Sequence, residues 1–327
     1  MSRPAPEVVV ITHRGGPLLA RCVDALQRQT CLPGTIRVVL SAAGNPPLPT
    51  GVEILRLGEN VGFARAANAG LQSVARGPVV LLNDDTEPEP GFLAALCDAA
   101  ESGGPGIYQP HIVLAGDPER LDNTGHRLFP DGFNLARGRG RPDQPAPSGA
   151  VGAFSGAAVL FTPEVIEQVG LFDADLEAFG EDVDLSLRAV RRGFAVRYVP
   201  AARIGHALGA TYGRAGARKI YLVERNRIRA AVRSLPTTAL LTMPAWTGLR
   251  LASLGMAAAA GRGVGATAGP RGAAAAAVGA LAGLRSVPDA LRKRNADRAG
   301  WVVGERGMWT HLLMHAVRPA DLLAPRP

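Results

Sequence analysis

The clearest indication of the fold is the stretch Pro78-Val79-Val80-Leu81-Leu82-Asn83-Asp84-Asp85. Its apolar run is rich in β-branched residues, which is typical of a buried parallel strand. In open α/β sheets, ligands bind beyond the carboxyl ends of the strands, where Asp84 and Asp85 stand. Carboxylates at that place suit a divalent cation bound together with a diphosphate, and Mg²⁺ or Mn²⁺ would fit. The alternative is a solvated turn in which Thr86-Glu87-Pro88 starts and caps the next helix.

Short apolar strands and helical stretches alternate around this segment. The pattern predicts strands at residues 8–11, 35–41, 52–57 and 78–83, and helices at 17–29, 63–76 and around 92–97. Such alternation predicts an α/β fold built from parallel βαβ units. From Phe154 the pattern resumes with an apolar strand, a short helix near 164–169, an acidic helix and a strand at 194–199.

Residues 101–150 interrupt the pattern because they are rich in Gly, Pro and Arg. The run Arg137-Gly138-Arg139-Gly140-Arg141-Pro142 predicts an exposed, mobile loop rather than a strand, and such a loop could act as a lid.

Length and charge limit the possible classes of protein. The chain has 327 residues, 47% of them apolar, and can bury a substantial core. Residues 237–327 contain 11 Lys and Arg but only 4 Asp and Glu, so they account for +7 of the formal net charge of +8. A main domain with almost no net charge argues against nucleic-acid binding. The basic C-terminal region suits contact with anionic phospholipid.

The cysteines and the N-terminus suggest a cytoplasmic protein. Cys22, Cys31 and Cys97 lack a paired metal-binding spacing, and three cysteines in a chain of this length suggest a reducing compartment. The N-terminus proceeds directly to a predicted strand and lacks the long apolar region of a signal peptide.

A second acidic cluster, Glu181-Asp182-Val183-Asp184, opens a helical stretch. Near a helix start Asp182 feels the positive end of the helix dipole, which favours its carboxylate, whereas desolvation by a bound acceptor would raise its pKa. Asp184 is expected to pack against Arg188 at the i+4 position in a structural role. Taken alone, the cluster is also consistent with an ordinary acidic helix N-terminus.

Seven short motifs, in order along residues 7–235, resemble glycosyltransferase family 2, nucleotide-sugar enzymes with a GT-A fold, and most closely its rhamnosyltransferase-like members. The motifs are Val8-Val9-Val10-Ile11-Thr12; Asn60-Val61-Gly62-Phe63-Ala64 with Asn68-Ala69-Gly70; Leu82-Asn83-Asp84-Asp85-Thr86; Ser155-Gly156-Ala157-Ala158; Gly170-Leu171-Phe172-Asp173; Gly180-Glu181-Asp182-Val183-Asp184-Leu185; and Tyr198-Val199-Pro200 followed by His206. The resemblance implies a GT-A nucleotide-binding sheet flanked by helices.

The resemblance also implies roles for individual residues. Asp85, with Asp84 as a helper, would bind the metal and the nucleotide diphosphate. Asp182 would be the catalytic base, and His206 would complete the metal site. Elementary chemistry agrees, because glycosyl transfer to a hydroxyl needs a proton acceptor near the nucleophile and a cation beside the departing diphosphate.

Thr12 and Arg14 end the first strand, where the family holds the nucleotide base, and Arg14 could stack on or pair with the nucleotide. We expect Asn60, Gly62 and Asn68 to shape the loop and helix beside the nucleotide, although turn and cap chemistry explains them equally well.

The chain departs from the family at residues 41–45, where Ser41-Ala42-Ala43-Gly44-Asn45 replaces the usual aspartate that contacts the base. His13, His111 and His126 have no comparable partner pattern. We therefore assign them structural or surface roles.

The sequence divides into a catalytic domain, residues 1–236, and a helical, basic region, residues 237–327. Glu224-Arg225-Asn226-Arg227 could meet phosphate groups or form a solvated helix face. The apolar stretches 240–260 and 273–284 are broken or too short to cross a bilayer. The basic cluster Arg292-Lys293-Arg294, with Trp301 and Trp309 nearby, fits adsorption to an anionic inner leaflet. A soluble helical hairpin packed on the catalytic domain or on a second subunit is the alternative.

Together these patterns predict an inverting, metal-dependent glycosyltransferase. It would move a sugar, with rhamnose as the candidate, from a nucleotide-diphosphate sugar to a hydroxyl of a cell-envelope glycan or lipid-linked acceptor. It would lie in the cytoplasm at the inner face of the membrane, with a homo-oligomer as an open question. The alternative is a non-catalytic, membrane-associated glycan-binding or scaffold protein that keeps the fold. No G-x-G-x-x-G follows the first strand, which disfavours a dinucleotide oxidoreductase.

Overall fold

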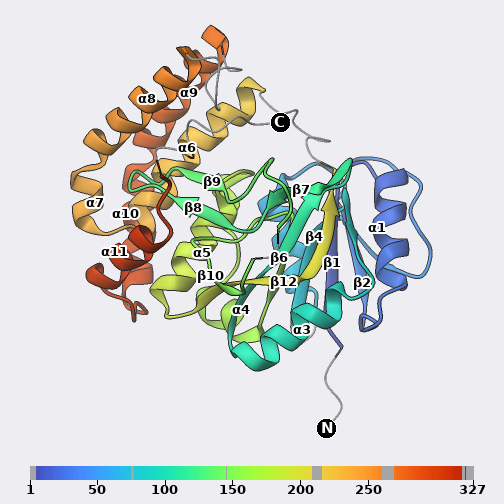
Figure 1. The fold of residues 1–327 in the computed structure, drawn as a ribbon. Helices are drawn as coiled ribbons and strands as arrows, with labels where there is room; N and C mark the ends of the chain where they lie inside the picture. The colour runs from blue at the N-terminus through green and yellow to red at the C-terminus, as the bar shows by residue number, and fades with distance from the viewer. Residues whose placement is uncertain are drawn as a thin grey trace.

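The fold is a mixed β-sheet with helices on its faces and a helical C-terminal region beside it (Figure 1). The computed structural model describes residues 5–74, 77–144, 146–207, 216–259, 269–318 and 321. The strands of the main sheet are β1 Glu7–Thr12, β2 Ile36–Leu40, β3 Glu53–Arg56, β4 Val79–Asn83, β5 Thr86–Pro88, β6 Gly106–Leu114, β7 Asp117–Asn123, β10 Gly149–Ala150, β11 Ala158–Phe161 and β12 Ala195–His206. A separate hairpin contains β8 His126–Leu128 and β9 Asn134–Ala136.

The order of the main sheet is β10-β12-β6-β11-β4-β1-β2-β3, with β5 paired to β12 and β7 paired to β6. β1 lies between β2 and β4, and all three run parallel. β11 is antiparallel to β4, so it returns the chain beside the carboxyl end of β4, where Asp84 and Asp85 follow. The α/β sheet flanked by helices that the sequence predicts is confirmed.

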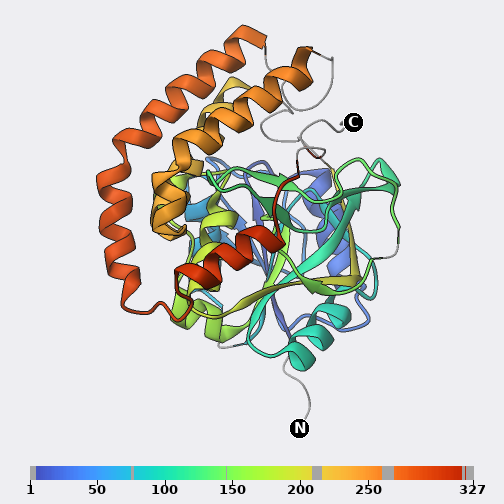
Figure 2. The same ribbon diagram turned by 60° about the vertical axis from the view of Figure 1, so that its left-hand side comes forward.

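The helices that pack with the sheet are α1 Pro17–Gln27, α2 Phe63–Gln72, α3 Phe92–Gly103, α4 Pro163–Val169 and α5 Glu181–Arg191, with a short 3₁₀ turn η1 Ala174–Leu176. The C-terminal helices are α6 Ala217–Ser234, α7 Thr237–Leu241, α8 Met243–Ala259, α9 Gly269–Arg285, α10 Val287–Arg298 and α11 Glu305–Met314. They gather on one side of the molecule, and the turned view shows α9 and α10 forming its outer edge (Figure 2).

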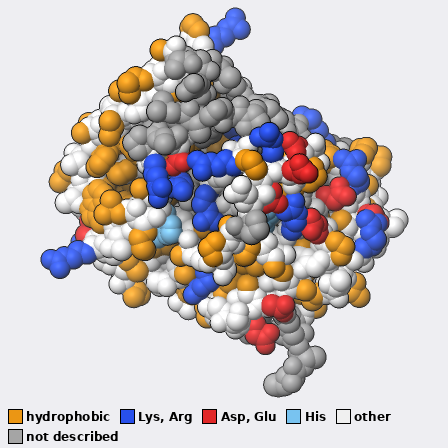
Figure 3. Space-filling view, viewed as in Figure 1, with side chains coloured by type: hydrophobic (Ala, Val, Ile, Leu, Met, Phe, Trp, Pro, Cys, Tyr) orange, Lys and Arg blue, Asp and Glu red, His pale blue; other side chains and the backbone are white. Residues whose placement is uncertain are grey.

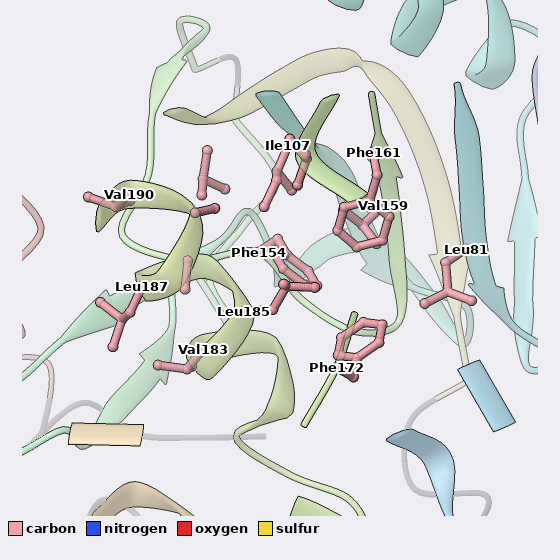
Figure 4. Packing of buried hydrophobic residues seen from close by; sticks show 14 of the residues in the cluster. Leu81, Ile107, Phe154, Val159, Phe161, Phe172, Val183, Leu185, Leu187 and Val190 are labelled. Carbon is pink, nitrogen blue, oxygen red and sulfur yellow. The ribbon is translucent and has the colours of Figure 1, made fainter. Parts of the chain in front are cut away.

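The sheet is buried on both faces because alternate residues of its central strands enter different cores. Val9 and Ile11 pack in one hydrophobic cluster with residues of α2, α4 and α5, whereas Val8 and Val10 pack in a second cluster with residues of α1 and α3. Figure 4 shows the first cluster, in which Phe154, Phe161 and Phe172 lie between the sheet and α5. Burial on both faces explains why these strands read as continuous apolar runs.

The four N-terminal strands and the helices between them agree with the sequence prediction, except that the second predicted helix reaches residues 75–76, which lie outside the described residues. Thr86–Pro88 does not cap a helix but forms β5 against β12.

The segment 137–142 is a turn and not a strand, as predicted, but residues 137–140 are half-buried and not exposed. Arg137 N donates to Gly125 O at 2.8 Å and Gly140 N to Leu121 O at 2.8 Å, so the segment is tied to β7 and the β8–β9 hairpin. The strand β6 was missed altogether, although all nine of its residues are buried.

Buried ion pairs join the C-terminal helices to the rest of the chain. Arg250 of α8 is 2% exposed and binds Asp131 at 2.8 Å and Glu224 of α6 at 2.9 Å. Arg227 of α6 also pairs with both carboxylates. The segment from Glu224 to Arg227 is therefore largely internal and not a solvated helix face.

The basic cluster at 292–294 is also turned largely inward. Lys293 binds Asp173 at 2.8 Å, and Arg294 donates to the carbonyl of Leu235 at 2.7 Å. Arg292 alone of the three is exposed, and it pairs with Asp289. The expectation that this cluster adsorbs to lipid is therefore wrong for Lys293 and Arg294. None of the described helices has the length and apolar character needed to cross a bilayer.

Replacing Arg250 with Ala should lower the free energy of unfolding by about 3 kcal/mol, because two carboxylates would stay buried with Arg227 as their remaining partner. Urea unfolding of the full chain measures this difference. The control is Arg28→Ala, which removes an exposed arginine paired with Asp24 and should change stability by less than about 0.5 kcal/mol. Equal effects of the two changes would contradict the proposed contribution of Arg250.

Candidate active site

Asp85, His206 and Asp122 form a line of contacts at the carboxyl end of β4. His206, the last residue of β12, places Nε2 3.3 Å from Asp85 Oδ1 and Nδ1 2.7 Å from Asp122 Oδ2. Asp122 belongs to β7 and is 1% exposed. The structure thus brings together the two predicted metal ligands and adds a carboxylate that orients the imidazole.

Burial opposes protonation of His206, but its hydrogen bonds with Asp122 and Asp85 outweigh burial and raise its pKa to about 9. Near neutral pH the ring therefore carries a proton between two carboxylates. A metal ligand must be neutral imidazole, so a cation and a proton compete for Nε2.

The donor set at this place suits a cation that a substrate completes. Asp85 Oδ1 is buried and lies 3.3 Å from His206 Nε2 without a well-aligned hydrogen bond, so a cation can take the place of the imidazole proton there. Within the described ranges no group of three or more His, Cys, Asp and Glu side chains is arranged to hold a metal alone. Asp85 and His206 supply two donors, and Mg²⁺-type sites commonly use one or two carboxylates together with substrate phosphates.

Asp84 faces β1 and not the histidine. Thr12 Oγ1 donates to Asp84 Oδ2, and the same hydroxyl oxygen accepts from the backbone N–H of Gly15 at 2.9 Å. Burial, strengthened by the charge of Asp85, raises the pKa of Asp84 to about 6 in spite of the Thr12 hydrogen bond. Asp84 thus fixes the turn after β1, and the side chain of Arg14 on that turn is exposed.

Asp182 lies in the first turn of α5, as the sequence predicts. Its Oδ1 accepts from its neighbour Val183 N at 2.8 Å, and its Oδ2 accepts from Gly156 N at 3.2 Å. His126 Nε2 lies 3.6 Å from Oδ2. Burial alone would raise the pKa of Asp182, but the imidazole and the backbone N–H groups outweigh it and lower that pKa. The carboxylate is therefore ionised and able to accept a proton.

The neighbouring Glu181 differs from Asp182. It is 6% exposed, its Oε2 has no hydrogen-bond partner, and burial together with the charge of Asp182 raises its pKa well above the usual range. Glu181 is thus the group of this pair that holds a proton most readily. Asp184 pairs with Arg188 at 2.8 Å, which confirms its predicted structural role.

Asn226 of α6 positions the loop that leads into α5. Its Nδ2 lies within 2.9 Å of the carbonyl oxygens of Leu176, Ala178 and Phe179. Glu177 and Phe179 in this loop have φ of 66° and 64°, which residues other than glycine seldom adopt. The buried amide stabilises a strained turn directly before Asp182.

Two lines of contact join the metal-ligand pair to Asp182. Asn123 follows Asp122 on β7, and its Nδ2 lies 3.3 Å from His126 Nε2, which faces Asp182. Asn83, two residues before Asp85, donates its N–H to Ala157 O at 3.0 Å, next to Gly156. The acidic groups expected from distant parts of the sequence therefore lie in one connected site.

Asn60 and Gly62 line a cavity of about 700 Å³ beside this site, together with Arg65, Asp175, Glu177 and others. Asn60 Oδ1 accepts from Gly62 N at 3.1 Å, and Gly62 has φ 82° with its α-carbon turned toward Glu177. Asn60 and Gly62 thus form the turn and also line the cavity.

Two other positions have structural roles. Ser41, which stands where the family has an aspartate, accepts from Val61 N at 3.0 Å and so fixes the cavity loop. Asn68 exchanges two hydrogen bonds with the backbone of Phe172, at 2.9 and 3.0 Å. Both polar ends of the Asn68 amide have protein partners, so the side chain joins α2 to the segment before α5. Its place beside the nucleotide stays a prediction.

A second cavity, of about 520 Å³, lies between β7, the β8–β9 hairpin and the C-terminal segment. Its lining includes Arg127, Arg137, Arg139, Arg141, Thr124, Tyr198 and Asp321. Asp85, Asp182 and His206 line neither cavity.

Sequence reasoning missed Asp122, Asn123, His126 and Asn226. The first three follow the missed strand β6, in the stretch 101–150, for which the sequence predicted no strand or helix. Asn226 was quoted only within a basic run. The available signal was a run of polar residues at the end of a strand, Asp122-Asn123-Thr124-Gly125-His126.

The chain is similar in sequence to known glycosyltransferases. The chain is 29% identical over 241 residues to N-acetylglucosaminyl-diphospho-decaprenol L-rhamnosyltransferase of Mycobacterium tuberculosis, over 63% of this chain and 77% of that protein. It is 27% identical over 172 residues to probable N-acetylgalactosaminyltransferase 6 of Caenorhabditis elegans, over 49% of this chain and 28% of that relative. The match therefore spans little more than a quarter of this second relative.

Solved structures share the fold at low sequence identity. GalNAc-T7 with UDP, GalNAc and Mn²⁺ superposes with a TM-score of 0.56 and 16% identity, over 71% of this chain and 48% of that one. The mannosyltransferase PcManGT of Pyrobaculum calidifontis, in complex with GDP-Man and Mn²⁺, superposes with a TM-score of 0.52 and 19% identity. The superposition covers 95% of this chain and 88% of that one. The model of the family described as glycosyltransferase like family 2 matches residues 4–233, most of the chain. The chain therefore belongs to glycosyltransferase like family 2 and has the GT-A fold of its structural neighbours.

Proposed function

We propose that this protein is an inverting, metal-dependent transferase that moves a sugar from a nucleotide-diphosphate donor to a hydroxyl of a cell-envelope glycan or lipid-linked acceptor. Rhamnose is the first candidate, because the Mycobacterium tuberculosis relative is named a rhamnosyltransferase with a diphospho-decaprenol acceptor. The observation that best supports the proposal is the line of contacts from Asp182 through His126 and the neighbours Asn123 and Asp122 to His206 and Asp85.

Asp182 is the proton acceptor in this proposal. Its lowered pKa keeps the carboxylate ionised, and the N–H groups of Val183 and Gly156 hold it in one orientation. As the acceptor hydroxyl attacks the anomeric carbon from the face opposite the diphosphate, Asp182 takes the hydroxyl proton. A single displacement of this kind inverts the configuration and needs no covalent sugar intermediate.

Asp85 and His206 would hold the divalent cation, Mg²⁺ or Mn²⁺, beside the donor diphosphate. When bound, the cation would neutralise charge that develops on the departing diphosphate. Asp122 orients the His206 ring toward Asp85. The solved neighbours that contain a nucleotide or nucleotide sugar together with Mn²⁺ support this assignment.

The nucleotide is expected near the turn after β1 and the cavity beside Asn60 and Gly62. Thr12 and Asp84 fix the turn that presents Arg14, and a cavity of about 700 Å³ is of the size that small-molecule sites commonly have. Both places lie beyond the carboxyl ends of parallel strands, where such sheets bind nucleotides.

Replacing Asp182 with Asn should lower the transfer rate by about a hundredfold or more while donor binding persists, because the amide accepts no proton. A panel of nucleotide sugars is first screened on the wild-type protein by thermal stabilisation with Mn²⁺, and transfer is then followed by mass spectrometry. The control is Asp24→Asn on α1, an exposed carboxylate paired with Arg28, which should transfer at the wild-type rate. Full turnover in the Asp182 variant would exclude it as the base.

Replacing Asp85 with Ala should weaken the Mn²⁺-dependent part of donor binding by about tenfold or more, since a charged metal ligand is lost. Titration calorimetry with the donor, with and without Mn²⁺, measures the effect. The same Asp24→Asn protein is the control. A Mn²⁺ effect of unchanged size in the Asp85 variant would remove this residue from the metal site.

We also propose a cytoplasmic location at the inner face of the membrane, through the C-terminal helices and not through the cluster at 292–294. Exposed apolar side chains gather over these helices in Figure 3. Among the exposed apolar side chains of α8 and α9 are Met256, which is 63% exposed, and Val278, Leu281 and Leu284, which are 58, 48 and 58% exposed. Apolar surface on a basic region suits an anionic lipid interface.

The double replacement of Val278 and Leu281 with Asp should weaken binding to phosphatidylglycerol-containing vesicles, because it adds like charges and removes apolar area. Flotation of the full chain with the vesicles measures this. Leu32→Asp is the matched control, since Leu32 is 63% exposed but lies just after α1, outside the C-terminal region. Equal flotation of both variants would contradict the assignment of α9 to the lipid interface.

A further inference from the structure

The cavity of about 520 Å³ beside the candidate active site has an unusual concentration of arginine. Arg127, Arg137, Arg139 and Arg141 all line it, and in Figure 3 the Lys and Arg side chains gather over the β8–β9 hairpin, next to which the cavity lies. Thr124 and Tyr198 add hydroxyl groups, and Leu121 and Leu135 add apolar surface. Such a mixture suits an organic molecule that contains an anionic group.

The side chains that line or contact this cavity carry more positive than negative charge. Arg139 pairs with Asp122 at 2.7 Å, while Arg127 and Arg141 share Asp321, at 3.6 and 3.3 Å. Four arginines therefore face two carboxylates, which leaves an excess of two formal positive charges. A phosphate monoester carries about two negative charges near neutral pH and would neutralise this excess.

Arg137 is the arginine without a carboxylate. Its Nε donates to Thr124 Oγ1 at 2.9 Å and its guanidinium stacks on Tyr198 at 4.8 Å, but within the described part of the chain no carboxylate lies within ion-pair distance. Burial, and also the charge of Arg127, lower its pKa. The same two arginines, after burial and His311, help to lower the pKa of His315 to about 4. A partly buried guanidinium with positive neighbours needs an anion.

Two features of this cavity indicate what kind of anion it can hold. Asp321 already places a carboxylate between Arg127 and Arg141, so the cavity has the geometry to hold an anionic group of this chain. The planar guanidinium group binds phosphate oxygens through two parallel hydrogen bonds, which makes arginine the preferred partner of phosphate.

The cavity adjoins the reaction site through one shared side chain. Asp122 pairs with Arg139 through Oδ1 and with His206 through Oδ2. An anion bound among the arginines would therefore lie next to Asp85 and His206. It would be held by the guanidinium groups and not by the metal site. The donor diphosphate is assigned to Asp85 and His206, which leaves the arginines to a second anionic substrate.

We propose that the cavity lined by Arg127, Arg137, Arg139 and Arg141 binds the phosphate or diphosphate group of the sugar acceptor. The existence of an anion site rests on the arginines alone, whereas its assignment to the acceptor rests on the proposed transferase function. Asp321 occupies part of the site when no acceptor is present, and an incoming phosphate displaces it from Arg127 and Arg141.

The first test measures binding of inorganic pyrophosphate to the full chain by titration calorimetry, in EDTA and without divalent cations, so that the metal site contributes nothing. Arg137→Gln should weaken binding by about tenfold or more, since a charge-assisted bidentate contact is lost. Arg141→Gln, whose side chain is 61% exposed and not needed for folding, should also weaken it. Arg28→Gln removes the same charge far from the cavity and should bind like the wild type.

Removing the internal competitor should have the opposite effect. Asp321→Asn should bind pyrophosphate more tightly than the wild type, because the arginines lose their carboxylate partner. If Arg137→Gln and Arg141→Gln both bind pyrophosphate like Arg28→Gln, or if the wild type does not bind it, the anion site is excluded.

A second test identifies the source of the phosphate. Steady-state transfer is measured with a soluble acceptor that contains a short isoprenyl diphosphate, at saturating donor. Arg137→Gln should raise the KM for this acceptor while the donor KM stays unchanged. A raised donor KM with an unchanged acceptor KM would assign the site to the nucleotide instead and overturn the acceptor proposal. The pyrophosphate result stands independently of turnover, so loss of the transferase function would not be mistaken for loss of the anion site.

Discussion

The amide of Asn226 is the contact on which the geometry of the site depends most. The fully buried amide of this side chain of α6 contacts three carbonyl oxygens and shares its two N–H groups among them. They belong to the loop before α5, where Glu177 and Phe179 have positive φ. Such conformations cost about 1–3 kcal/mol each and persist only where surrounding contacts impose them. The position of the first turn of α5, and with it the direction of the Asp182 carboxylate, therefore depends on a helix that begins 35 residues later.

α6 also links the site to the C-terminal helices. Asn226 and Arg227 of this helix are buried, and α6 also packs against α5, α10 and α9, where Gly279 and Gly283 allow the two backbones to approach closely. The helix that shapes the catalytic loop is thus the same helix that supports the lipid-facing candidates α8 and α9. A movement of those helices at a membrane surface would reach the loop before Asp182 through one rigid element.

The sequence alone predicted the structure correctly where a single physical rule determines it. Continuous apolar runs gave β1 to β4, and the carboxyl-end rule placed Asp85 at the edge of the sheet, whereas its pairing with His206 came from the family resemblance. Sequence prediction failed where long-range pairing overrides local composition: β6 becomes an internal strand because it pairs with the distant strands β11 and β12, and β7, which carries Asp122, is added to the sheet as its hairpin partner. The burial of Glu224, Arg227 and Arg250 was missed for a related reason, since charged side chains read as solvated until their partners are placed. The roles of Asp182, of the metal ligands and of the nucleotide-binding turn remain predictions.

The pairing of Arg250 with Asp131 and Glu224 has a consequence for the separation of the chain into two parts. The predicted boundary after residue 236 lies between partners that neutralise each other in the interior, with Asp131 on one side and Arg250 on the other. A fragment that ends there would keep the carboxylates but lose one of their two counter-ions, and would uncover the apolar surface that Met308 and Leu312 protect. Modular exchange of the helical region between relatives would therefore succeed only when the donated helices bring an arginine at the position of Arg250.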